Sequence, residues 1–145
     1  MAADSSVSHT LFFIVAVLVA GSLAGVFIGL ANDMSRTMQD RGDAISDQLQ
    51  TDITIINDPV VVPYSDSTLT LYVKNTGTST LSRSSLTILV DGLYQNYTVP
   101  GAPADPSWTP QKVLEIEMEV VLLPGDHKVK VVTANGVADE MQFRL

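Results

Sequence analysis

Three glutamates at alternate positions are the densest group of side chains able to do chemistry: Glu115, Glu117 and Glu119. Carboxylate oxygens suit hard cations such as Ca²⁺ and Mg²⁺. On one face of a strand, however, neighbouring carboxylates lie about 7 Å apart, so the three cannot hold one ion without other ligands. The pattern therefore predicts a solvated strand face, and we expect no metal and no cofactor.

The two histidines, His9 and His127, are the other candidates for acid–base chemistry. His9 precedes an apolar segment and His127 follows a turn signal, so each is predicted to be an ordinary surface histidine. No Gly-x-Ser-x-Gly turn is present for a nucleophilic serine, and no glycine-rich loop follows a strand and opens a helix. We therefore expect a protein that is not an enzyme and has no small-molecule substrate.

Composition removes further classes. The sequence has no cysteine, which excludes disulfides, zinc–thiolate sites and thiol catalysis. Sixteen acidic residues stand against eight basic ones, giving a net charge of −8. Because phosphate contacts require a basic patch, nucleic acid is not an expected partner.

An apolar block opens the chain. Residues 11–31 are uncharged and mostly apolar, and the charge-free stretch runs from Ser5 to Asn32. A helix needs about 20 such residues to span a bilayer. The alternative is a cleaved secretory signal, but no basic residue precedes the block, the run is longer than an apolar signal core, and no clear cleavage site follows it. Residues 1–31 are predicted to form a retained transmembrane helix.

Small residues recur every fourth position on two adjacent faces of this helix. The two sets are Gly21, Gly25 and Gly29, and Ala16, Ala20 and Ala24. In lipid, helices associate through close backbone approach, so this spacing predicts self-association or docking onto another transmembrane helix. The alternative is that glycine is frequent in membrane helices in general.

Residues 32–51 are polar but compatible with a helix. Their apolar residues, at spacings of four, seven and four, are Met34, Met38, Ile45 and Leu49. Such a narrow stripe is typical of a coiled-coil seam. We expect a helical stalk that pairs with a neighbour; a flexible linker with accidental periodicity is the alternative.

From residue 52 the apolar period changes to two. Strands are predicted at residues 53–55, 68–74, 86–90, 94–99, 113–121, 127–133 and 137–143. Asp91-Gly92 and Asn135-Gly136 are strong hairpin signals. About seven short strands predict an antiparallel, immunoglobulin-like β-sandwich over residues 52–145. The fold class is therefore mainly β, preceded by one long N-terminal transmembrane and stalk helix.

Strand edges are the natural basis for binding in such a domain. Lys128 and Lys130 are predicted to guard one edge, whereas the Val60–Val62 run and the C-terminal strand are predicted to be open. Asn96-Tyr97-Thr98 fits the N-glycosylation triplet. The single tryptophan, Trp108, is thin support for a sugar-binding groove and is expected to cap the core instead.

Membrane orientation stays open on sequence physics alone. Arg36 and Arg41 would keep the C-terminal side in the cytoplasm, but they are interleaved with Asp33, Asp40 and Asp43. The β-sandwich and the glycosylation triplet favour the outside.

An ordered set of segments resembles the FlaG family of archaeal flagellar (archaellum) accessory proteins. The segments are Ser6–His9 before the apolar block, Gln48–Ile53, Asn57-Asp58, Val73–Gly77, Val90–Gly92 with Tyr94-Gln95, Trp108 with Pro110, and Gly125–Val132. Single pieces such as Lys-Asn-Thr-Gly are common in immunoglobulin-like modules. The resemblance covers nearly the whole chain in the same order.

The resemblance implies a structural protein of the archaellum motor. It places the helix in the cytoplasmic membrane and the sandwich outside the cell, self-associating and acting with the sister protein FlaF, which contacts the surface layer. Together they would form a static anchor, or stator, for swimming motility. The resemblance carries no catalytic motif.

A filament subunit resembling an unprocessed type IV pilin is the alternative function. Pilin precursors carry a basic residue and a glycine before the apolar helix, and residues 1–10 have neither. Processing is therefore not expected, although an unprocessed subunit could still form a filament with helices in the core and β domains outside. The sequence does not separate a ring from a filament.

Overall fold

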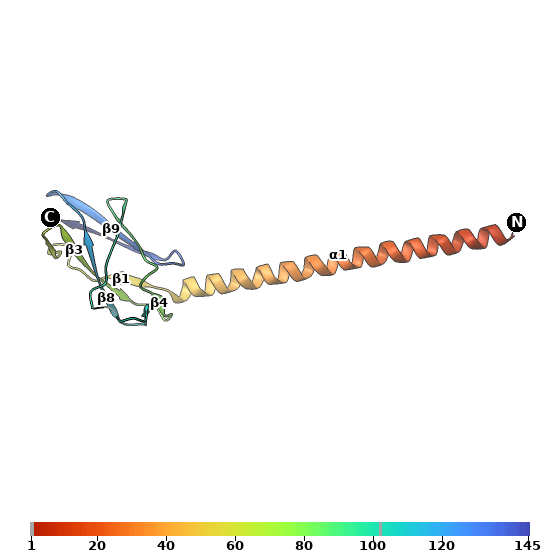
Figure 1. Cartoon of the computed structure of the whole chain (residues 1–145), viewed down its shortest axis with the longest axis horizontal. Coiled ribbons are helices and arrows are strands. Elements are labelled where there is room, and N and C mark those ends of the chain that lie inside the picture. Colours follow the sequence, from red (N-terminus) through yellow and green to blue (C-terminus); the bar gives the residue numbers. More distant parts are fainter. Residues whose placement is uncertain (1, 102) are drawn as a thin grey trace. The chain divides into compact units, whose positions relative to one another are not determined.

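The computed structural model describes the backbone of residues 2–101 and 103–145 and the side chains of residues 7–101 and 103–145. One helix, α1 (Ala2–Gln50), is followed only by strands in that description (Figure 1). The chain divides into two units, residues 1–43 and 44–145. The last turn of α1 therefore belongs with the β domain.

The first unit is helical and its described side chains are all exposed. It contains a helix long and apolar enough to cross a membrane by length and composition. Phe12 and Phe27 are 75% and 70% exposed. Such an apolar surface is compatible with membrane anchoring.

The β domain consists of two main sheets. One contains β1 (Ile53–Ile55), β2 (Tyr64–Ser65), β3 (Thr68–Asn75) and β8 (Val113–Glu119). The other has the order β10 (Ala138–Arg144), β9 (Asp126–Val132), β5 (Thr87–Val90) and β6 (Leu93–Gln95). A small two-stranded sheet pairs β4 (Leu81–Ser82) with β7 (Ser107–Trp108). Every pairing is antiparallel.

This topology confirms the predicted immunoglobulin-like sandwich. In the usual lettering, β1, β3 and β8 take the places of strands A, B and E, while β10, β9 and β5 take those of G, F and C. The inward residues of both sheets alternate with outward ones and form one core, in which Leu71, Ile116 and Val131 are fully buried. Trp108 is 3% exposed and belongs to this core, as expected.

The hairpin turns follow the predicted chemistry. Asp91 and Gly92 have φ of 52° and 82°, the pair of left-handed residues that a tight two-residue hairpin needs. The chain reverses from β5 to β6 at this point. Gly136 likewise has positive φ, between β9 and β10.

Three expectations about strands were wrong. Lys128 and Lys130 lie on β9, which is paired on both sides, so they guard no edge. The Val60–Val62 run is a loop between β1 and β2, because both strands pair with the same side of β3 and the chain bulges between them. The strand predicted over 94–99 ends at Gln95, and Thr98 crosses to the other sheet, where it bridges Glu117.

Candidate functional site

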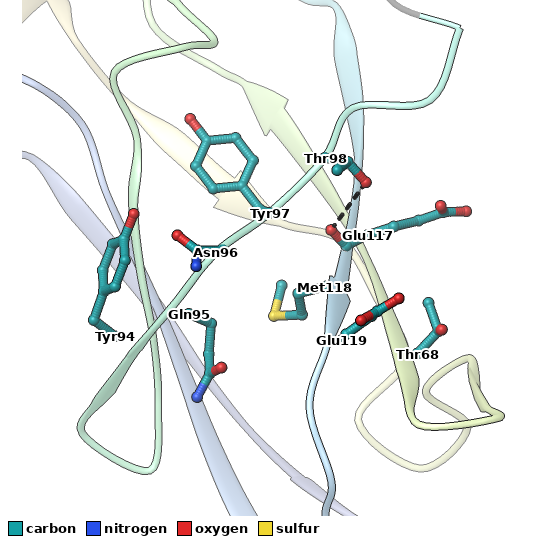
Figure 2. A pocket seen from close by; sticks show the side chains of 9 residues that line it. All are labelled: Thr68, Tyr94, Gln95, Asn96, Tyr97, Thr98, Glu117, Met118 and Glu119. Carbon is teal, nitrogen blue, oxygen red and sulfur yellow. Dashed lines mark hydrogen bonds between the residues drawn. The ribbon is translucent and has the colours of Figure 1, made fainter.

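A groove of about 510 Å³ separates β6 from β8. Figure 2 shows Tyr94, Gln95, Asn96 and Tyr97 along one wall and Glu117 and Glu119 along the other. The Thr98 bridge closes one end, with its N–H 2.8 Å from the Glu117 carbonyl and the Glu117 N–H 2.9 Å from the Thr98 carbonyl. The groove therefore lies along the edge of a sheet.

The predicted carboxylate row forms the outer face of β8. Glu115 and Glu119 are exposed and Glu117 is half-buried, while the residues between them face the core. The Tyr72 hydroxyl donates to Glu115 Oε1 at 3.2 Å, and this hydrogen bond raises the pKa of Tyr72. Among the described residues no group of three or more His, Asp or Glu is arranged to hold a metal ion.

Asn96, the predicted glycosylation residue, lies on the opposite rim of the groove. It follows the end of β6 and is exposed. Its neighbour Tyr97 turns toward the protein, where its hydroxyl donates to the Arg83 carbonyl at 2.7 Å. The hydrogen bond of Tyr97 thus fixes the segment to the domain, while the Asn96 side chain stays exposed to solvent.

The end of α1 is built into the β domain by the loop after β3. The Gln50 carbonyl, which has no partner within the helix, accepts from the N–H groups of Thr78 at 2.8 Å and Ser79 at 3.2 Å. The Asp52 carbonyl accepts from Thr76 at 3.0 Å and Gly77 at 2.9 Å. This loop, residues 75–79, caps the helix and fixes the start of β1 together.

The buried Asn75 side chain fixes the capping loop to the core of the sandwich. It is fully buried, and its amide donates to the carbonyls of Ser79 at 2.9 Å and Trp108 at 3.1 Å. Its Oδ1 accepts from the Gly77 N–H at 3.1 Å. Three satisfied hydrogen bonds explain why a polar side chain lies in an apolar core.

A second hairpin contacts the helix end through Asn135. Its amide donates to Thr51 Oγ1 at 2.7 Å, and its carbonyl accepts from Gln48 Nε2 at 2.9 Å. The Thr51 hydroxyl in turn donates to the Asp47 carbonyl at 2.7 Å. The last turn of α1 is therefore held from two sides, a junction that the sequence did not predict because its partners lie far apart in the chain.

His127 is not the ordinary surface histidine that the sequence suggested. Its side chain is 12% exposed. Nδ1 lies 2.7 Å from Asp91 Oδ2 and Nε2 lies 2.7 Å from the Leu123 carbonyl. Both partners are acceptors, so satisfying both requires a proton on each ring nitrogen. The bonds to Leu123 and Asp91 raise the pKa of His127, and the bonds from Lys128 N–H and His127 lower that of Asp91.

These shifts predict how stability depends on pH. The His127 contribution is complete below its unfolded pKa of 6.5 and is lost as pH rises through the higher folded value. The Asp91 contribution is present above pH 3.8 and is lost as pH falls through its lower folded value. We expect His127→Gln to destabilise the β domain most in mildly acidic solution, below the unfolded histidine pKa of 6.5. The destabilisation should be smaller in alkaline solution.

Denaturant titration followed by Trp108 fluorescence measures this effect. His9→Gln is the matched control, because His9 lies outside the β domain, and its profile should follow that of the unmodified protein. A His127→Gln penalty that is constant from mildly acidic to alkaline pH would contradict the ion pair.

Within the described part of α1, the residues of the predicted helix-packing face and stalk seam are exposed. A Cβ atom added at Gly21, Gly25 or Gly29 would meet nothing within 4 Å. The seam residues Met34, Met38, Ile45 and Leu49 are 61%, 61%, 57% and 82% exposed. Self-association through these surfaces, and through Ala16, Ala20 and Ala24, stays a prediction.

Known proteins resemble this chain over most of its length. The family model of archaeal-type flagellin matches residues 3–143. The putative flagella-related protein G of Methanococcus voltae is 31% identical over 142 residues, covering 94% of each chain. The protein of the same description from Methanocaldococcus jannaschii is 29% identical over 143 residues, covering 94% of this chain and 92% of its own.

A solved structure also resembles the chain, at a TM-score of 0.45 and 18% identity. It is described as the archaellum periplasmic stator protein complex FlaF and FlaG from Sulfolobus acidocaldarius, and the match covers 63% of this chain and 87% of that one. The flagella-related relatives confirm the resemblance to FlaG found in the sequence. The chain therefore belongs to the archaeal-type flagellin family, together with the flagella-related G proteins.

Proposed function

We propose that the chain is a membrane-anchored structural component of the archaellum motor. In this role α1 holds the protein in the cytoplasmic membrane and associates with neighbouring helices. The β-sandwich projects outside the cell and binds a FlaF-type partner linked to the surface layer. The protein would act as a static anchor against which the motor turns.

The observation that carries this proposal is the junction between the last turn of α1 and the sandwich. A stator element must pass force between its membrane helix and its external domain. Main-chain hydrogen bonds from residues 76–79 to Gln50 and Asp52, with the Asn135 contacts on the other side, fix the last turn of α1 to the sandwich and support this role. Membership of a flagellar family supports the same role.

A filament-forming subunit is the second candidate, and the match to archaeal-type flagellin over residues 3–143 favours it. In that case the helices with their glycine face would form a core, and the sandwiches would lie outside. The two candidates share the helix surface and differ in the size of the assembly.

Asn96 is proposed as an N-glycosylation site of the external domain. It is exposed and stands on the groove rim, so a glycan there would not disturb the core. The mass of the protein from its native host, compared with that of Asn96→Gln, reports whether a sugar is attached.

The absence of native cysteine allows a direct test of orientation, which both candidates require. We expect Ser84→Cys, at an exposed position of the β domain, to react with a membrane-impermeant maleimide in intact cells. Ala3→Cys, before the apolar block, should react only after lysis. The opposite pattern would place the sandwich in the cytoplasm and overturn the proposed anchor.

A further inference from the structure

The main chain at and just after the end of β8 has open hydrogen-bonding groups at Glu119 and Val121. Val120 N–H donates to the Ser67 carbonyl at 2.8 Å and Leu122 N–H donates to the Tyr64 hydroxyl at 3.0 Å. The N–H groups of these even-numbered residues therefore point toward β2 and β3. The N–H groups of Glu119 and Val121 point away from that sheet, whereas the Leu123 carbonyl is taken up by His127 Nε2 at 2.7 Å. In the part of the chain that the structure describes, the N–H groups of Glu119 and Val121 have no hydrogen-bond partner.

One strand position beside β8 is empty. Constant-type immunoglobulin domains place a fourth strand, D, next to strand E. Within residues 2–101 and 103–145, the only segment paired with the outer side of β8 is Thr98, through its bridge to Glu117. The groove of about 510 Å³ opens beside this edge. The sheet thus offers main-chain groups and space where a strand could be added.

The side chains along this edge define what would bind. Glu117 and Glu119 line the groove, and none of its lining residues is basic. The side chains of Val121 and Leu123, which follow β8, are 80% and 75% exposed. A complementary strand therefore carries lysine or arginine opposite the glutamates and apolar side chains opposite Val121 and Leu123.

We infer that an extended, basic and apolar segment of a second protein adds as a strand to the edge at Glu119 and Val121. The inference rests on the proposed function and deepens it, because it names the surface that holds the partner. A second copy of this chain does not supply the segment from its own alternating lysines. Lys128 and Lys130 lie on β9, whose main chain is already paired on both sides.

Proline substitutions on β8 test the edge without touching the core side of the strand. Glu119→Pro removes an outward N–H in the groove, and proline is tolerated on an edge strand. Val113→Pro is the matched control, since Val113 lies on the same side of β8 but beyond the Thr98 bridge. The probe is a labelled, end-capped peptide Val-Thr-Val-Thr-Lys-Thr-Lys, whose valines and lysines share one strand face, titrated against full-length protein in detergent by fluorescence anisotropy.

We expect Glu119→Pro to weaken peptide binding by about tenfold or more, the loss of one or two main-chain hydrogen bonds. Val113→Pro should change it less than about twofold. A peptide with glutamate in place of lysine should not bind. Equal binding by the two peptides, or by Glu119→Pro and the unmodified protein, would overturn the inference.

Hydrogen exchange on the unmodified protein gives a readout that does not depend on how the variants fold. The amides of Glu119 and Val121 should exchange more slowly when the lysine peptide is present, and unchanged exchange at both would overturn the inference. The experiment with the peptide does not require any archaellum protein as a partner. Failure of a FlaF-type protein to bind, with the peptide still protecting this edge, would count against the proposed function alone.

Discussion

Gly77→Ala is expected to destabilise the β domain by about 3 kcal/mol, a large effect for one methyl group. A Cβ at Gly77 would lie 2.5 Å from both Asp52 N and Gln50 O and 3.1 Å from Thr51 C. All three are backbone atoms, so no side chain can rotate away. Gly77 does not have positive φ, and the penalty therefore comes from contact and not from backbone conformation.

The clash would also weaken the hydrogen bonds by which the capping loop, residues 75–79, holds the helix end. Gly77 N–H donates to the Asp52 carbonyl and to Asn75 Oδ1, and displacement of the loop weakens both bonds, each worth about 1 kcal/mol. Thermal or denaturant unfolding followed by Trp108 fluorescence measures the loss. Trp108 reports on this region because its carbonyl accepts from Asn75.

Gly42→Ala is the matched control for this substitution. Its added Cβ would meet nothing within 4 Å, and alanine favours a helix over glycine by about 1 kcal/mol. Unfolding of the β domain should be unaffected. If Gly77→Ala were as stable as Gly42→Ala, the capping loop would not hold the helix end as described.

Gly25→Ile is expected to reduce self-association of the full-length protein by at least about tenfold, or 1.4 kcal/mol. Gly21, Gly25 and Gly29 lie on one helix face, and bulk there prevents the close backbone approach that joins helices in lipid. Because a Cβ at Gly25 meets no atom of the same chain, the substitution leaves the single helix intact. Any loss of association then comes from contacts between chains.

Leu23→Phe places added bulk on the opposite helix face and is the control. Sedimentation in detergent measures the distribution of species for each variant. The glycine face is the contact surface if Gly25→Ile alone shifts the protein toward monomer. If both variants gave the same distribution of species in sedimentation, the glycine face would not be the contact surface. The glycines would then only reflect the general composition of membrane helices.

Local patterns predicted the elements of this fold well. The charge-free stretch from Ser5 to Asn32, the period-two strands and the Asp91-Gly92 turn are all readable within a few residues, because each depends on near neighbours. The buried alternation of Leu114, Ile116 and Met118 followed for the same reason.

Contacts between residues far apart in the chain could not be predicted from the sequence. Residues 94–99 alternate like one strand, but the chain leaves β6 after Gln95 because Thr98 finds its hydrogen bonds on the other sheet. Asn75-Thr76-Gly77 was seen as a turn, while its role as a helix cap depends on Gln50. The pKa of His127 is raised by its hydrogen bonds to the Leu123 carbonyl and to Asp91, and Asp91 lies 36 residues away in the chain.

Electron microscopy of the full-length protein in detergent, alone and with a FlaF-type partner, tests the anchoring role most directly. The account predicts small discrete particles of the protein alone, joined through their helices, that bind the partner when it is added. Long helical polymers of the protein alone, with no binding of the partner, would contradict the static anchor and make the protein a filament subunit.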